Sequence, residues 1–192
     1  ELADIIKYAS DNSFKVKAVG SGHSFSNIMQ TSDFLINCHS MNKPIEIDKE
    51  ILKPVEYLNE NNFDLKYLEH VENGITIKHL NSYLDDKELA LFNMGGYDAQ
   101  TIAGVISTST HGTGISLGPI CDTVVSIIMV GEFGKIYRIE KANGITDPGK
   151  YQQKYPDNIL IQEDDFFNAV LVNMGSMGIF YSVILRVTDS YY

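Results

Sequence analysis

The segment from Thr101 to Gly114, TIAGVISTSTHGTG, most constrains what this chain can fold into. It holds three glycines, six hydroxyl side chains, one histidine and no acid. We do not expect an ordinary core helix or strand here, because glycine favours unusual dihedrals and close approach to a ligand. Uncharged hydroxyl and backbone N–H donors suit a phosphate or pyrophosphate. The sequence therefore predicts a ligand-binding loop, paired with a second glycine loop upstream, VGSGHSF at residues 19–25.

Composition sets broad limits on the class of protein. The 192 residues fit one large domain or two small lobes, and 44% hydrophobic with 21% charged residues is typical of a globular chain. A net charge of −10 argues against a nucleic-acid partner. Two cysteines, Cys38 and Cys121, are too few for a disulfide scaffold and favour a cytoplasmic location. No apolar run reaches the length of about 18 residues expected of a transmembrane helix.

Hydrophobic periodicity indicates an α+β fold. Helices are predicted near residues 2–9, 76–89 and 164–172, and strands near 14–18, 34–37, 45–48, 65–71, 124–130, 135–139 and 179–187. Residues 141–162 are polar and predict a long exposed excursion. A boundary near residues 116–119 divides the chain into a first lobe, 1–115, which carries both glycine loops, and a second lobe, 116–192.

Several conspicuous residues also have simpler interpretations. An isolated His23 is compatible with an exposed loop, and His111 with a turn. His39, His70 and His79 have no metal-ligand spacing, so no metal site is predicted. Gly20-Ser-Gly22 is only a fragment of a dinucleotide-binding fingerprint. The chain contains neither a P-loop nor a Gly-x-Ser-x-Gly elbow, which disfavours a P-loop nucleotidase and a hydrolase.

Four ordered motifs resemble one family. AVGSGHSFS (18–26), ENGITIKHLNSYLDDKELALFNMGG (72–96), GGYDAQTIAGVISTSTHGTG (95–114) and NMGSMGIFYSVILRVT (173–188) resemble the FAD-binding domain of the vanillyl-alcohol oxidase, or PCMH-type, superfamily. The aldonolactone and alditol oxidases of that superfamily are especially similar. The resemblance implies a two-lobed α+β domain with FAD between the lobes. It also implies an alcohol oxidation in which a polyol, sugar or aldonolactone gives hydride to flavin N5 and dioxygen reoxidises the flavin.

The resemblance also implies the site residues. The first loop would hold the pyrophosphate, the second loop would continue the site, and Ile179 would contact the cofactor from the second lobe. His23 would carry a covalent bond to the 8α-methyl carbon of the flavin, and Gly95 would leave dioxygen a path to the ring. The implied cofactor-binding set is Gly20, Ser21, Gly22, His23, Ser24, Phe25, Gly96, Thr101, Gly104, Thr108, Ser109, Thr110, His111 and Ile179.

The sequence also departs from the family pattern. Residues 50–63 look inserted, and the substrate domain that follows the FAD domain in these enzymes is not in the sequence, so we expect residues 1–192 alone to be inactive. Three alternatives stay open. The chain could belong to a branch that acts on sterols, hydroxy acids or amines, to the NADPH-dependent cell-wall reductases, or to a non-catalytic flavin-binding protein.

Overall fold

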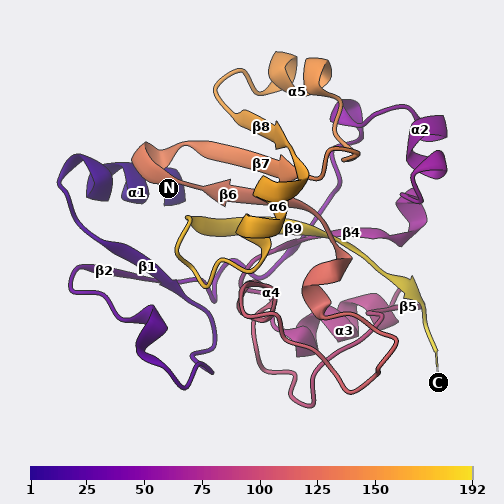
Figure 1. Ribbon diagram of the computed structural model, residues 1–192, viewed down its shortest axis with the longest axis horizontal. Helices are drawn as coiled ribbons and strands as arrows, with labels where there is room; N and C mark the ends of the chain where they lie inside the picture. The colour runs from indigo at the N-terminus through magenta and orange to yellow at the C-terminus, as the bar shows by residue number, and fades with distance from the viewer. Residues whose placement is uncertain (192) are drawn as a thin grey trace.

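A computed structural model describes residues 1–191, which fold around three sheets (Figure 1). The strands are β1 (Val16–Val19), β2 (Phe34–Asn37), β3 (Pro44–Ile45), β4 (Leu68–Glu72), β5 (Leu89–Ala90), β6 (Val124–Val130), β7 (Ile136–Glu140), β8 (Ile159–Gln162), β9 (Ile179–Arg186) and β10 (Thr188–Asp189). Six of them form the largest sheet, in the order β3-β4-β9-β6-β7-β8. The parallel β1–β2 pair lies to one side of it, and β5 pairs with β10.

Helices cover this sheet and bury its apolar side chains. They are α1 (Leu2–Asp11), α2 (Val55–Glu60), α3 (Ile77–Asp85), α4 (Ile102–Ser107), α5 (Pro148–Lys154) and α6 (Asp164–Leu171). One buried cluster joins α3, α4 and α6 to the sheet through Leu80, Ile106, Phe167 and Ile127. A second cluster includes Leu58 of α2. The mixture of helices and sheets confirms the predicted α+β class. No helix among residues 1–191 has the length and apolar character needed to cross a membrane.

The helix predicted at residues 76–89 is confirmed in its start and its buried face. The side chain of Thr76 accepts a hydrogen bond from the backbone N–H of His79 at 3.2 Å, which caps α3. Ile77, Leu80 and Leu84 are buried at helical spacing. The helix ends at Asp85, four residues before the predicted end.

Two predicted strands are shorter than expected, and an acidic side chain caps a 3₁₀ turn next to each of the observed strands. Only Pro44–Ile45 of the segment around residues 45–48 pairs as a strand, and the side chain of Asp48 accepts from the N–H of Glu50. Likewise, Asp64 accepts from the N–H of Lys66 at 2.9 Å, so residues 65–67 form a turn and β4 begins at Leu68.

The prediction that residues 141–162 form an exposed excursion is wrong. This segment contains α5 and β8, and β8 adds a parallel edge strand to β7. A buried polar network holds it, because Glu140 accepts hydrogen bonds from the Thr146 hydroxyl at 2.6 Å and the Gln162 amide at 2.9 Å. Arg138 completes the network with an ion pair to Glu140. The prediction failed because it took polar composition as a sign of exposure, whereas these polar groups form hydrogen bonds with one another inside the fold.

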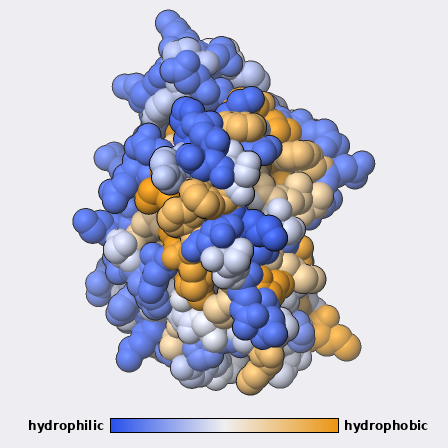
Figure 2. All heavy atoms as spheres, turned by 90° about the vertical axis from the view of Figure 1, so that its left-hand side faces the viewer, coloured by the Kyte–Doolittle hydropathy of each residue, from blue (hydrophilic) through white to orange (hydrophobic). Residues whose placement is uncertain are grey.

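An aromatic cluster fixes α1 against the β1–β2 pair. The ring of Phe14 lies 6.3 Å from that of Tyr8 and 5.5 Å from that of Phe34, and the Phe14–Phe34 contact is edge-to-face. Figure 2, which views this side of the molecule, shows apolar side chains in patches between polar ones. The cluster positions β1, and β1 leads directly into the first glycine loop.

His70 on β4 is expected to make stability depend on pH. It is 7% exposed, and its Nε2 lies 2.9 Å from the Ser182 hydroxyl. Burial, with the nearby Arg138 guanidinium, lowers the pKa of His70 from 6.5 to about 4. Below pH 6.5 the unfolded chain therefore takes up a proton that the folded protein does not. This contribution is complete above pH 6.5 and falls by about 3 kcal/mol as the pH drops to about 4.

Denaturant titrations of wild type and His70→Gln at pH 7 and at about pH 4 test this expectation. Glutamine can keep a hydrogen bond to Ser182 but does not titrate, so the wild type should lose more stability on acidification. Equal losses in the two proteins would contradict it.

Candidate cofactor site

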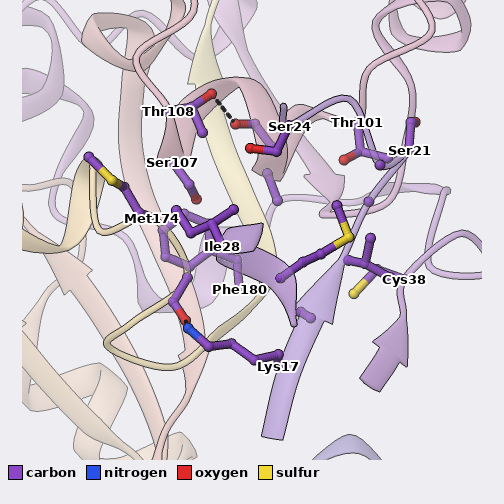
Figure 3. A pocket seen from close by; sticks show the side chains of 18 of the residues that line it. Lys17, Ser21, Ser24, Ile28, Cys38, Thr101, Ser107, Thr108, Met174 and Phe180 are labelled. Atoms are coloured by element: carbon purple, nitrogen blue, oxygen red, sulfur yellow. Dashed lines mark hydrogen bonds between the residues drawn. The ribbon is translucent and has the colours of Figure 1, made fainter. Parts of the chain in front are cut away.

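A cavity of about 360 Å³ lies where β1, α4 and the turn before β9 meet (Figure 3). Residues 17–25 form one wall, residues 100–108 a second, and residues 173–180 a third. Segments distant in the sequence therefore enclose a single cavity, and the first glycine loop lines it.

Glycine is required in the first loop for two different reasons. A Cβ at position 20 would overlap the Thr101 hydroxyl and lie 3.1 Å from the Thr101 Cβ, so only glycine permits this approach. Gly22 has a φ of +70°, which disfavours other residues even though an added Cβ would meet no atom within 4 Å. Ser21 fixes the loop by donating a hydrogen bond to the carbonyl of Ala99. The loop thus presents its backbone closely to the cavity.

The second glycine segment contains a helix, which corrects the expectation that it forms no ordinary core element. Ile102, Val105 and Ile106 recur at helical spacing and are buried, so α4 forms around this apolar face. Its other face lines the cavity with Gly104, and the Thr108 hydroxyl donates to the Gly104 carbonyl at 2.8 Å. The helix therefore brings hydroxyl groups to the wall, as Figure 3 shows for Thr101, Ser107 and Thr108.

The electrostatic character of the lining suits an anion. Among the described residues that line the cavity, Lys17 is the only lysine or arginine, and no aspartate or glutamate is present. The Lys17 ammonium lies 3.5 Å from the carbonyl of Gly175. This is notable in a chain of net charge −10, because a diphosphate would meet one cation and neutral donors without a repelling carboxylate.

Two buried amides at the cavity have polar atoms without a hydrogen-bond partner. Asn73 is 2% exposed and its Oδ1 is unpaired, while Asn173 is 6% exposed and its Nδ2 is unpaired. Both residues line the cavity. Burial raises the pKa of the Cys38 thiol next to Asn73, so Cys38 presents a neutral group. Both atoms are shielded from the open cavity, because each has almost no accessible surface. The glycine cradle, the Lys17 ammonium and the uncharged hydroxyl groups of the lining fit FAD.

His23 lies in the first loop, on the cavity lining, and its side chain is exposed. Its ring is in an edge-on contact with Tyr97, with 4.6 Å between ring centroids and 62° between the planes. Tyr97 belongs to the segment that leads into α4. This contact limits where the imidazole can lie but leaves it accessible from the cavity.

The structure brings most of the sequence-predicted residues together. Those that line the cavity are Gly20, Ser21, Gly22, His23, Ser24, Phe25, Thr101, Gly104, Thr108 and Ile179. The others, Gly96, Ser109, Thr110 and His111, together with Gly95, lie outside the lining. In the chain that follows α4, the Ser109 hydroxyl lies 3.8 Å from the Cys121 thiol, and the Thr110 carbonyl accepts from Ile120. Roles for these residues toward a cofactor stay predictions.

Sequence reasoning missed Lys17, Asn73 and Asn173. Lys17 lies in the predicted strand near residues 14–18, where alternation with apolar residues carries no sign of a cavity. Asn73 precedes Gly74, a pair that is typical of a turn. One signal for Asn173 was present, since it begins the NMGSMGIF motif.

Comparison with protein families identifies the class. Residues 1–140 match the family model described as FAD binding domain, so the chain belongs to this family. Within residues 1–191, no group of three or more His, Cys, Asp or Glu side chains is arranged to hold a metal ion.

Curated relatives are lactone oxidoreductases. Over its full length the chain is 28% identical to L-gulonolactone oxidase of Mus musculus and 29% identical to D-arabinono-1,4-lactone oxidase of Debaryomyces hansenii. It is 27% identical over 97% of its length to L-gulono-1,4-lactone dehydrogenase of Mycobacterium tuberculosis strain H37Rv. The chain spans 36%, 30% and 35% of these three proteins, about a third of each.

Solved structures share the fold. A cholesterol oxidase from Brevibacterium sterolicum, as a His121Ala mutant, matches 97% of this chain and 32% of its own with a TM-score of 0.69 at 11% identity. An alkyldihydroxyacetonephosphate synthase matches 98% of this chain and 30% of its own, with a TM-score of 0.68 at 17% identity. At these identities the likeness shows the fold alone, and the match to the FAD binding domain family confirms the resemblance found in the sequence.

Proposed function

We propose that this chain is the FAD-binding part of an oxidoreductase that oxidises an alcohol carbon of an aldonolactone, sugar or polyol. The observation that carries the proposal is the cavity at the first glycine loop, with its glycine cradle, single ammonium group and absence of acid. The lactone oxidases and dehydrogenase among the relatives support the substrate class.

The residues of the cavity have distinct tasks in this proposal. Backbone N–H groups around Gly20 and Gly22, with the Thr101 hydroxyl, would hold the diphosphate, while the Thr108 hydroxyl, which donates to the Gly104 carbonyl, would line the site. When bound, the flavin ring supplies a two-electron acceptor for the substrate's C–H bond. His23 would hold the ring at the first-loop end of the cavity through a bond from an imidazole nitrogen to the 8α-methyl carbon. That bond would replace the imidazole N–H and one methyl C–H, and dioxygen would take up the two hydrogens as hydrogen peroxide. Since no cysteine lies in residues 101–114, a second attachment there is not part of the proposal.

The division into lobes at residues 115 and 116 is also proposed. Cavity walls come from both sides of this boundary, from residues 17–25 and 100–108 on one side and residues 173–180 on the other. FAD would therefore lie between the two parts. The six-stranded sheet also crosses the boundary, because β4 of the first part pairs with β9 of the second.

The activity can be tested on the full-length protein. Under anaerobic conditions, aldonolactones and polyols are each mixed with the enzyme while flavin absorbance is followed. At least one should bleach the flavin at a rate that saturates with substrate concentration. NADPH is added in a separate experiment to test the alternative that the protein is a reductase. Bleaching by NADPH, with no response to any alcohol, would favour a reductase and contradict the proposal.

Gly95 is proposed to keep open a path for dioxygen to the flavin. It has no side chain, and a Cβ there would lie 3.3 Å from the Thr110 methyl group, so the backbone tolerates a larger residue with modest adjustment. Gly95→Val should slow reoxidation of the reduced enzyme by air about tenfold or more, if the access barrier rises by about 1.4 kcal/mol. Stopped-flow reoxidation measures this rate, and hydrogen peroxide is the expected product.

Anaerobic flavin reduction by substrate is the control for Gly95→Val and should be unchanged. One of the relatives is called a dehydrogenase, so slow reoxidation by dioxygen is the defined alternative outcome. Slow reoxidation of the wild type, or equal rates in the two proteins, would show that Gly95 does not govern oxygen access.

A further inference from the structure

We propose that Tyr97 positions the imidazole of His23 for its bond to the 8α-methyl carbon of the flavin. This role rests on the proposed covalent attachment and adds the residue that prepares it. The step removes a proton from the imidazole and one from the methyl carbon and leaves two electrons on the ring. It ends when dioxygen takes up both electrons and both protons as hydrogen peroxide. Because the nucleophilic nitrogen must face the carbon, the orientation of the imidazole governs how fast the bond forms.

The two glycine segments pass one another in opposite directions, which brings position 97 opposite position 23. The Ser21 hydroxyl donates to the carbonyl of Ala99 at 2.5 Å. Two residues further along the first segment and two residues back along the second, the His23 ring meets the Tyr97 ring, with 4.6 Å between the ring centroids. The contact therefore follows from the course of both backbones as well as from the two side chains.

The backbone around Tyr97 is fixed by the start of α3. The Asp98 carbonyl accepts a hydrogen bond from the N–H of Lys78 at 2.8 Å, and the Gln100 carbonyl accepts one from the N–H of Ile77 at 2.9 Å. The Ile77 side chain is buried in the core. A helix end that is anchored in the core therefore holds the segment from which the Tyr97 ring projects.

The His23 side of the contact has fewer constraints. His23 is exposed and follows Gly22, whose φ of +70° places the loop in a conformation without a side chain to support the ring. Tyr97 is 52% exposed, so the core does not clamp the pair. The ring planes are inclined at 62°, which is the edge-on arrangement that aromatic rings favour. Tyr97 thus limits the orientations of an imidazole that lines the cavity, and it acts through His23 as a positioning residue.

The rate of covalent attachment tests this role. Full-length apoprotein, produced without flavin, is mixed with saturating FAD in air, and the flavin fluorescence that survives acid precipitation is followed with time. Tyr97→Ala should form the bond about three- to tenfold more slowly than wild type, because the edge-on contact no longer holds the imidazole. Tyr97→Phe keeps the ring and should match the wild-type rate. In a His23→Ala background, Tyr97→Ala should leave the reversible affinity for FAD unchanged, because the partner ring is already absent.

Tyr155→Ala is the matched control. The Tyr155 ring also contacts one aromatic neighbour, Tyr151, with 5.3 Å between centroids, and it lies outside the cavity lining, so attachment should proceed at the wild-type rate. If Tyr97→Ala does not fold, Tyr97→Leu takes its place, since leucine fills the space without a flat ring, and the same slower attachment is expected.

Equal attachment rates in wild type and the Tyr97 variant without a ring would overturn the positioning role and leave the proposed bond standing. So would a loss of FAD affinity on Tyr97→Ala in the His23→Ala background, because Tyr97 would then act on the cofactor or the loop and not through His23. Wild-type protein that binds FAD but never forms the bond would overturn the proposed attachment as well.

Discussion

Replacing Gly20 with alanine is expected to weaken FAD binding by about 10- to 100-fold, which corresponds to about 1–3 kcal/mol of overpacking. The added Cβ would overlap the Thr101 hydroxyl, with the Thr101 Cγ2 at 3.2 Å on the same side. Thr101 is 2% exposed and precedes α4, so it cannot move aside easily. The first loop must shift instead, and it then presents its N–H groups in the wrong place.

Titration of the His23→Ala apoprotein with FAD measures this loss, with Gly149→Ala as the matched control. At Gly149 an added Cβ meets only the Asp147 Oδ1, at an ordinary 3.4 Å. In a Thr101→Ala background, which lacks the overlapping hydroxyl, Gly20→Ala should cost less FAD affinity than it does in the parent. Full FAD affinity in Gly20→Ala would show that the close packing of the loop does not matter for the cofactor.

Replacing His23 with alanine is expected to abolish covalent attachment of flavin while leaving the fold intact. The side chain is exposed, and its ring contact is with the half-exposed Tyr97, so its loss removes little packing. In the wild type, the tryptic peptide that contains His23 should carry the flavin mass. In His23→Ala, denaturation should release all FAD. The reduction potential of the flavin should also fall, because the bond withdraws electron density from the ring.

His79→Ala is the control for this experiment. His79 is exposed on α3 and lies outside the cavity lining. It should retain covalent flavin in full. Release of FAD from denatured wild-type protein would refute the bond at His23 without refuting FAD binding.

Local sequence predicted the parts of the fold that depend on local chemistry. Thr76 followed by apolar residues at helical spacing predicted α3, and the spacing of glycines around His23 predicted a loop at a ligand site. In α4, the glycines and hydroxyls masked a buried face of Ile102, Val105 and Ile106. One short segment here serves both the core and the cavity, and composition alone does not separate the two.

Long-range contacts account for what the sequence did not reveal. The polar segment 141–162 is folded because Thr146 and Gln162 meet Glu140 inside the protein. Asn73 and Asn173 lie a hundred positions apart and line one cavity only in the folded chain. Which polar residues border a cavity is a property of tertiary structure and has no signature in spacing or composition.

The central claim is that FAD occupies the cavity enclosed by β1, α4 and the turn before β9. A crystal structure of the full-length protein grown with FAD tests it most directly. Continuous density is expected through this cavity, joined to the imidazole of His23 at one end and lying against residues 173–180 at the other. FAD bound elsewhere, or a cavity closed by its own side chains in the flavin-loaded protein, would contradict it.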